Sequence, residues 1–159
     1  MQTNYDDSDK TLNKPERRIN KAAIIALSAG HFWVDTYSGF IIPILPLIAT
    51  KLNISLSLVG LIITISSLGS SLLQPFYGLI SDFFKRRFFI FWGLILSSIF
   101  ISFTGYAHKY WILALMLFLG NMGTGFYHPQ ASSLIGYLSK NKINKFMGLF
   151  IASGSIGYA

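Results

Sequence analysis

Long apolar stretches alternate along the chain with short charged ones. Four stretches carry at most one formal charge each, and they lie between Lys21 and Lys51, Lys51 and Asp82, Arg87 and Lys109, and Lys109 and Lys140. Each holds at least the ~20 mostly apolar residues that a helix needs to cross a ~30 Å hydrocarbon core. The pattern predicts four membrane-spanning helices, over about 22–50, 57–81, 88–107 and 111–138.

The last apolar segment is shorter than the other four. After Lys145 the chain reads FMGLFIASGSIGYA and stops at Ala159. As a helix this segment would rise about 21 Å, which is less than the hydrocarbon core. Small residues recur four apart in it, a spacing that suits close helix packing. We expect residues 146–159 to be a truncated fifth spanning helix, and the chain to be a fragment.

Composition supports an all-α membrane protein. Of the residues, 52% are hydrophobic and 12% are charged, whereas soluble domains carry about 25% charged residues. The first apolar segment is too long for a signal-peptide core and no small-residue cleavage site follows it. The chain has no cysteine, which excludes disulfides and thiolate metal sites.

The positive charge is a topology signal. The net charge is +7, but eleven of the thirteen Lys and Arg residues lie in the N-terminal tail and in the loops near 85 and 140. The two alternate loops hold only Lys51 and Lys109. By the positive-inside rule, the tail (1–21) is cytoplasmic, and residues 22–159 form a multi-pass domain in the cell membrane. Nucleic acid is therefore not an expected partner.

One carboxylate interrupts the first predicted helix. Asp35 would cost roughly 2.5–3.5 kcal/mol at the centre of a membrane helix on insertion scales, so intramembrane carboxylates are functional-site candidates. His31 lies one turn earlier, on the same helix face. His128, in the fourth predicted helix, falls at a similar depth, about 27 Å from the outer end against about 28 Å for His31. These groups can therefore face one polar cavity.

Structural interpretations of the same residues remain open. Asp35 could simply be hydrogen-bonded by His31 or by serines of the second helix, and Tyr127 could satisfy its neighbour His128. Asn121 can serve as a polar contact on a glycine-rich packing surface. A metal site made of His31, Asp35 and His128 is not expected, because three ligands on two helices lack a motif spacing. The serines in question are Ser66, Ser67, Ser70 and Ser71.

The loop between the second and third predicted helices, GLISDFFKRR, resembles the signature loop of the major facilitator superfamily. Four residues match that pattern of a glycine, an aspartate and two basic residues: Gly78, Asp82, Arg86 and Arg87. Two depart from it, because Phe83 stands where a basic residue is usual and Lys85 where a second glycine is usual. Such bases could also be positive-inside anchors alone.

A narrower resemblance extends from about residue 22 onward. The segments GHFWVDTYSGFIIPILPLI, SSLLQPFYGLISD and GFYHPQASSLIG resemble the fosmidomycin resistance protein group of that superfamily. One departure is Gln130, which stands where a glutamate is common in the group. The resemblance implies that the chain is the first part of a twelve-helix fold, and it adds Gln130 to the expected cavity residues His31, Asp35, Asn121 and His128.

The resemblance implies a secondary active transporter that exports a small drug or polar metabolite in exchange for protons. Its expected partners are the lipid bilayer, the proton, a small-molecule substrate and the missing C-terminal helices, supplied as a separate chain. No cofactor is expected. An enzyme is disfavoured, because no nucleophile elbow or phosphate-binding glycine loop is present.

Two alternatives remain beside this interpretation. One is a four-helix exporter of the small multidrug type that dimerises to make a complete transporter. The other is a remnant of a split or interrupted gene without activity. If the chain is a fragment of a transporter or such a remnant, it is expected to transport nothing by itself, whereas the dimeric exporter would be active without further helices.

Overall fold

The computed structural model describes residues 19–159, apart from the side chain of Asp82, and this part of the chain is helical with no strand. Most of the predicted tail, 1–21, lies outside the described residues. The α-helices are α1 (Lys21–Leu52), α2 (Leu56–Ser67), α3 (Gln74–Phe83), α4 (Arg86–Ser102), α5 (Tyr110–Ser139) and α6 (Ile143–Tyr158). A π-helix, Leu68–Leu72, joins α2 to α3, and short 3₁₀ turns, Phe103–Tyr106 and Lys140–Lys142, follow α4 and α5.

The first helix begins and ends at residues that cap it. At its start, the side chain of Asn20 accepts a hydrogen bond from the Ala23 backbone N–H at 3.0 Å. At its end, Asn53 adopts a left-handed conformation with a φ of 52°, in which its backbone N–H reaches the last carbonyl groups. Asparagine tolerates this conformation better than most residues. The helix is therefore 32 residues long and keeps Pro43 and Pro46 inside it.

The second predicted helix, 57–81, is not continuous. Pro75 has no N–H to donate to the carbonyl one turn earlier, and, unlike Pro43 and Pro46 inside α1, it lies at the start of an α-helix, α3, and not inside one that runs on from α2. The chain widens instead into the π-helix, where the Leu73 N–H donates to the Leu68 carbonyl five residues back at 3.1 Å. Single π turns of this kind are frequent at functional sites. Tyr77 closes the region by donating its hydroxyl to the Gly69 carbonyl at 3.1 Å.

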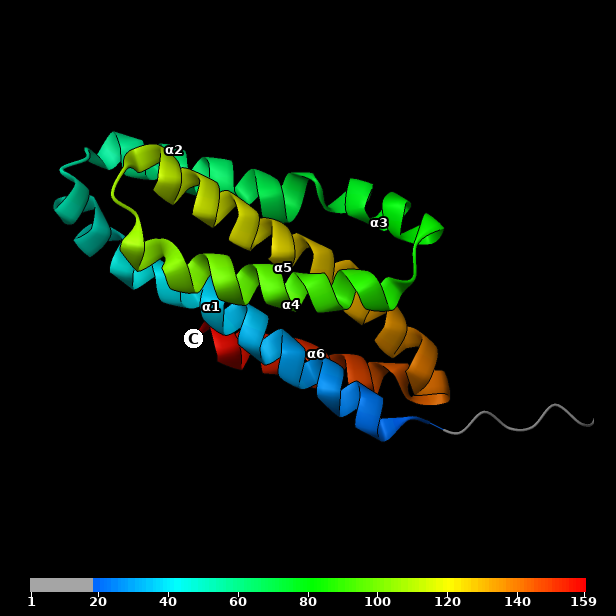
Figure 1. Cartoon of the computed structure of the whole chain (residues 1–159). Coiled ribbons are helices and arrows are strands. Elements are labelled where there is room, and N and C mark those ends of the chain that lie inside the picture. Colours follow the sequence, from blue (N-terminus) through cyan, green and yellow to red (C-terminus); the bar gives the residue numbers. More distant parts are fainter. Residues whose placement is uncertain (1–18) are drawn as a thin grey trace, which may run out of the picture.

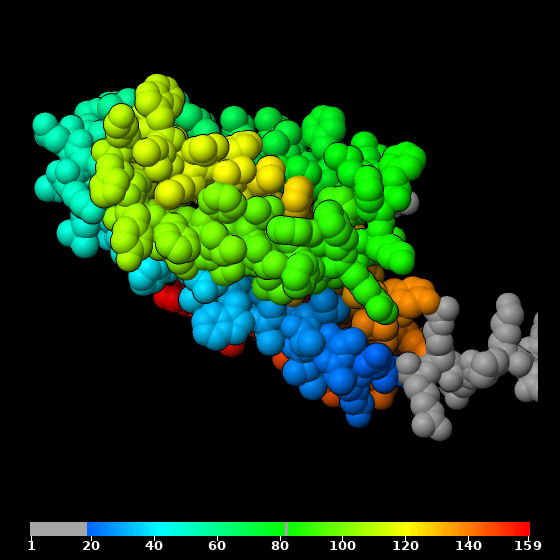
Figure 2. All heavy atoms as spheres, in the orientation of Figure 1, coloured from blue at the N-terminus to red at the C-terminus, as the bar shows by residue number. Residues whose placement is uncertain are grey.

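Helices far apart in the sequence pack side by side (Figure 1). The chain turns back at Lys140, whose φ is 49°, and α6 then runs along α1. On the other side, α4 and α5 approach closely where Gly123 meets Gly93: a Cβ atom on Gly123 would lie 2.7 Å from the Gly93 carbonyl oxygen. Figure 2 shows α4 and the first part of α5 covering one face of the bundle, with α1 below them.

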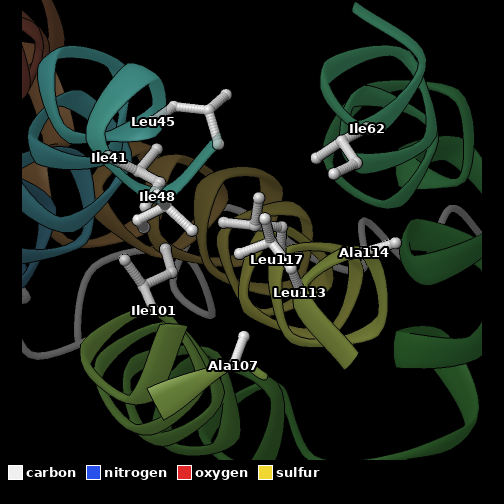
Figure 3. Close-up of a cluster of buried hydrophobic side chains, with 9 residues drawn as sticks. All are labelled: Ile41, Leu45, Ile48, Ile62, Ile101, Ala107, Leu113, Ala114 and Leu117. Carbon is white, nitrogen blue, oxygen red and sulfur yellow. The ribbon is translucent and has the colours of Figure 1, made fainter. Parts of the chain in front are cut away.

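A buried hydrophobic cluster joins α1, α2, α4 and α5 with Ala107 of the loop between α4 and α5 (Figure 3). Many large apolar side chains point outward instead, such as Leu47 at 71% and Trp111 at 73% exposure. Four helical segments are long and apolar enough to span a membrane: Lys21–Leu52, Leu56–Ser81, Arg86–Tyr106 and Tyr110–Tyr158, the last of which includes both α5 and α6. The cluster comprises Ile41, Leu45, Ile48, Ile62, Ile101, Ala107, Leu113, Ala114 and Leu117. The prediction of an all-α membrane protein is confirmed.

Candidate functional site

Asp35 is bonded on both carboxylate oxygens. His31, one turn earlier on α1, places its Nε2 3.2 Å from Asp35 Oδ2. His128 on α5 places its Nε2 3.2 Å from Asp35 Oδ1. The two imidazole rings meet edge to face, with their centroids 4.8 Å apart. The structure thus brings together the three ionisable residues that spacing and depth had suggested.

The His31 ring is held from the side of α6. Its Nδ1 lies 2.7 Å from the Phe150 carbonyl oxygen, and its ring stacks on the Phe150 ring at 3.9 Å. Tyr127, expected as a possible partner of His128, instead donates its hydroxyl to the Leu27 carbonyl and is fully buried. The hydrogen-bonding partner of His128 is therefore Asp35.

A cleft of about 490 Å³ opens beside this cluster, between α1, the α2–α3 segment and α5. The serines that were alternative partners of Asp35 are not bonded to it. Ser66 and Ser67 donate to carbonyl groups of their own helix, at 2.8 Å and 2.9 Å. The polar wall of the cleft consists of Asp35, Ser38, Ser66, Ser67, Ser70, Ser71, Gln74, Asn121, Thr124 and His128.

The two other expected cavity residues differ in position. Asn121 lines the cleft, and its side-chain amide donates to the Leu117 carbonyl of its own helix at 2.9 Å. Gln130 does not line the cleft. It is buried at 3% exposure and donates its amide to the Ser81 hydroxyl on α3 at 2.7 Å. Residues two apart on a helix do not share a face, which separates Gln130 from His128.

The signature-loop residues lie where α3 passes into α4. Arg86 begins α4 and donates to the Ser133 hydroxyl on α5 at 2.9 Å, while Arg87 is exposed. A Cβ atom on Gly78 would meet nothing within 4 Å, so no close approach requires glycine there within the described residues. The side chain of Asp82 lies outside the described residues.

Within the described part of the chain, the group that could hold a metal ion is the same His31–Asp35–His128 cluster. One ligand atom from each residue lies within 4.8 Å of the others. Both carboxylate oxygens already face imidazole nitrogens, however, so protons can complete the arrangement. The cluster therefore has the chemistry to bind, share and release a proton.

Two contributions from α6 were not among the expected site residues. The Phe150 carbonyl is a backbone group, and sequence does not show which carbonyl a histidine 119 residues away will find. Gly154 packs directly against the cluster and leaves no room for a side chain, since a Cβ atom there would lie 2.6 Å from both Asp35 Oδ2 and His31 Nε2. Small-residue spacing in this segment predicted close packing, but it did not identify the partner.

The long apolar helices and the polar cluster within them define a polytopic membrane protein with an ionisable site inside its spans. The chain belongs to the major facilitator superfamily, whose family model matches residues 27–159. The superfamily consists of transporters, in agreement with the expectation that the chain is not an enzyme.

Relatives with curated descriptions point the same way. Quinolone resistance protein NorA of Staphylococcus aureus is 30% identical over 122 residues, which cover 74% of this chain and 31% of the relative. An MFS-type transporter of Methanocaldococcus jannaschii is 27% identical over 135 residues, which cover 79% of this chain and 34% of the relative. The chain thus spans about a third of the length of these relatives. These matches establish the superfamily and not the fosmidomycin resistance group within it.

Proposed function

We propose that this chain takes part in the export of a small drug or polar metabolite in exchange for protons, and that Asp35 is the residue that takes up and releases the proton. The observation that carries the proposal is the carboxylate of Asp35, bonded by His31 and His128 inside an apolar span and at the wall of a cleft. An ionisable group inside a membrane span is energetically costly, and such groups mark proton and substrate sites in transporters.

The coupling follows from competition at the cleft. A substrate that enters beside Asp35 and displaces or repels its proton links the two binding events. In alternating access, the site then opens to one side of the membrane at a time. His31 and His128 can share the proton, because each places an imidazole nitrogen 3.2 Å from a carboxylate oxygen of Asp35. Superfamily membership favours this mechanism over a dimeric four-helix exporter.

The substrate class and the orientation are part of the same proposal. Quinolones are one candidate, because NorA is described as a quinolone resistance protein. Fosmidomycin is the other, from the resemblance of the helix motifs. We also propose that the N-terminus is cytoplasmic, because eleven Lys and Arg residues lie on that side against two on the other.

The test is drug accumulation in cells that express the gene together with its flanking DNA. We expect wild type to lower accumulation of a quinolone or of fosmidomycin, and an uncoupler to abolish the effect. Asp35→Asn keeps the size of the side chain and removes its titration, so accumulation should return to that of cells without the gene. Asp6→Asn, a change in the N-terminal segment, is the matched control. Normal efflux by Asp35→Asn would show that the carboxylate is structural.

A further inference from the structure

The contact between His31 and α6 identifies the position of one proton. The Phe150 carbonyl oxygen can only accept a hydrogen bond, so His31 Nδ1, 2.7 Å away, must carry a hydrogen and donate it. In a neutral imidazole one nitrogen is protonated and the other is not. A neutral His31 held in this way therefore presents an unprotonated Nε2 to Asp35.

The contact between His31 and Asp35 then requires a second proton. His31 Nε2 and Asp35 Oδ2 lie 3.2 Å apart, and neither a lone pair on Nε2 nor an ionised carboxylate can donate. One further hydrogen must lie on Nε2 or on Oδ2. The His128 contact needs no such addition, because a neutral His128 protonated on Nε2 can donate to Oδ1. The cluster as packed thus holds one proton more than a carboxylate with two neutral imidazoles.

Close packing of α6 makes this arrangement possible. Gly154 lies against the point where His31 Nε2 meets Asp35 Oδ2, and a methyl group there would overlap both atoms. The titratable groups around His31 are Asp35 on α1 and Tyr127 and His128 on α5. From α6, the described contacts with His31 come from Phe150 and Gly154, neither of which titrates. Across the cleft, the α2–α3 segment contributes Gln74 and serines.

We propose that α6 is the positioning element of the proton site: the Phe150 carbonyl oxygen orients His31 with Nδ1 protonated, and Gly154, which has no side chain, lets α6 pack directly against the point where His31 and Asp35 share the additional proton. The inference rests on the proposed function for the use of that proton. When the proton leaves, His31 cannot keep both contacts. Because a hydrogen bond to an ionised carboxylate is stronger than one to a carbonyl, His31 then donates to Asp35 and gives up the Phe150 carbonyl, so proton release loosens the α1–α6 packing.

Asp35→Asn should remove the competition between the two contacts of His31, with residue 35 and with the Phe150 carbonyl. Its amide nitrogen can donate to His31 Nε2 while its oxygen accepts from His128, which reproduces both contacts without the additional proton. The variant should therefore keep His31 on the Phe150 carbonyl at every pH. This behaviour separates a proton-dependent contact from a merely structural one.

The measurement is NMR of the chain in lipid nanodiscs, with ¹⁵N-labelled histidine and ¹³C-labelled phenylalanine carbonyls. Signals are assigned by their loss in His31→Gln and Phe150→Leu. We expect a protonated Nδ1 on His31 near neutral pH. We also expect a shift of the Phe150 carbonyl resonance as the pH is raised, and no such shift in Asp35→Asn. A wild-type His31 protonated only on Nε2, or a Phe150 carbonyl insensitive to pH, would overturn the proposal.

Two alanine variants on α6 complete the test. Gly154→Ala should remove the hydrogen-bonded Nδ1 signal, whereas Gly148→Ala should leave it unchanged, because a Cβ atom on Gly148 meets nothing within 4 Å. Equal spectra for the two variants would also count against the proposal. None of these readouts needs transport. A normal NMR result with failed drug efflux would therefore remove the proposed function and retain the positioning role of α6.

Discussion

Asp35 is tolerated within its helix because its surroundings replace the hydrogen bonds of water. The insertion cost of roughly 2.5–3.5 kcal/mol applies to an isolated charge. Here each carboxylate oxygen has an imidazole nitrogen 3.2 Å away. Hydrogen bonds to ionised groups contribute about 1.5–3 kcal/mol each. Two such bonds are therefore of the right size to offset the insertion cost.

The same residues show what sequence can and cannot predict about a site. The i, i+4 spacing predicted the His31–Asp35 contact, and counting residues from the helix ends placed His128 at the same depth. Spacing did not predict the Phe150 carbonyl, because backbone groups have no residue type to single them out. Gln130 was expected in the cavity from its place in a motif, but helix geometry turns it toward Ser81.

At the scale of elements, helix existence was easier to predict than helix continuity. Stretches of spanning length with at most one formal charge predicted the apolar helices. The break in the second one lies just before Pro75, as a π turn at Leu68–Leu72. A proline did not suffice to predict it, because Pro43, Pro46 and Pro129 lie inside helices that stay continuous. The packing of α6 along α1 depends on tertiary contacts of small residues, which the sequence indicates only as a spacing.

The α4–α5 contact allows a direct test of close helix packing. Gly123→Ala would place a methyl group 2.7 Å from both the Gly93 carbonyl oxygen and the Ser97 backbone nitrogen. Overpacking of this kind costs typically 1–3 kcal/mol, so we expect a lower unfolding temperature for the purified chain in detergent.

Gly136→Ala on the same helix is the control. A Cβ atom at Gly136 would lie 3.7 Å from Ile143, an ordinary contact. Because alanine favours helix over glycine by about 1 kcal/mol, this variant should unfold at the same temperature as wild type or higher. Equal destabilisation by both variants would show that the α4–α5 approach is not what requires glycine.

At the scale of the whole molecule, the positions of the charged loops predict how the bundle is oriented in the membrane. We expect the loops at Lys85 and Lys142 to face the cytoplasm and those at Asn53 and Lys109 to face outward. Because the chain has no cysteine, single cysteines at these positions can be labelled with an impermeant thiol reagent in intact cells. Labelling should occur at positions 53 and 109 only. Labelling at positions 85 and 142 instead would show that the orientation is the reverse of the expected one.

The central claim is that Asp35 couples substrate movement to proton movement, and the most direct measurement is substrate-dependent proton flux. Inverted vesicles from cells that express the gene with its flanking DNA are given a pH gradient, which a fluorescent dye reports. Adding the exported drug should dissipate the gradient in wild type and leave it intact in Asp35→Asn. An equal loss of the gradient in both would contradict the role of Asp35 as the proton-coupling residue.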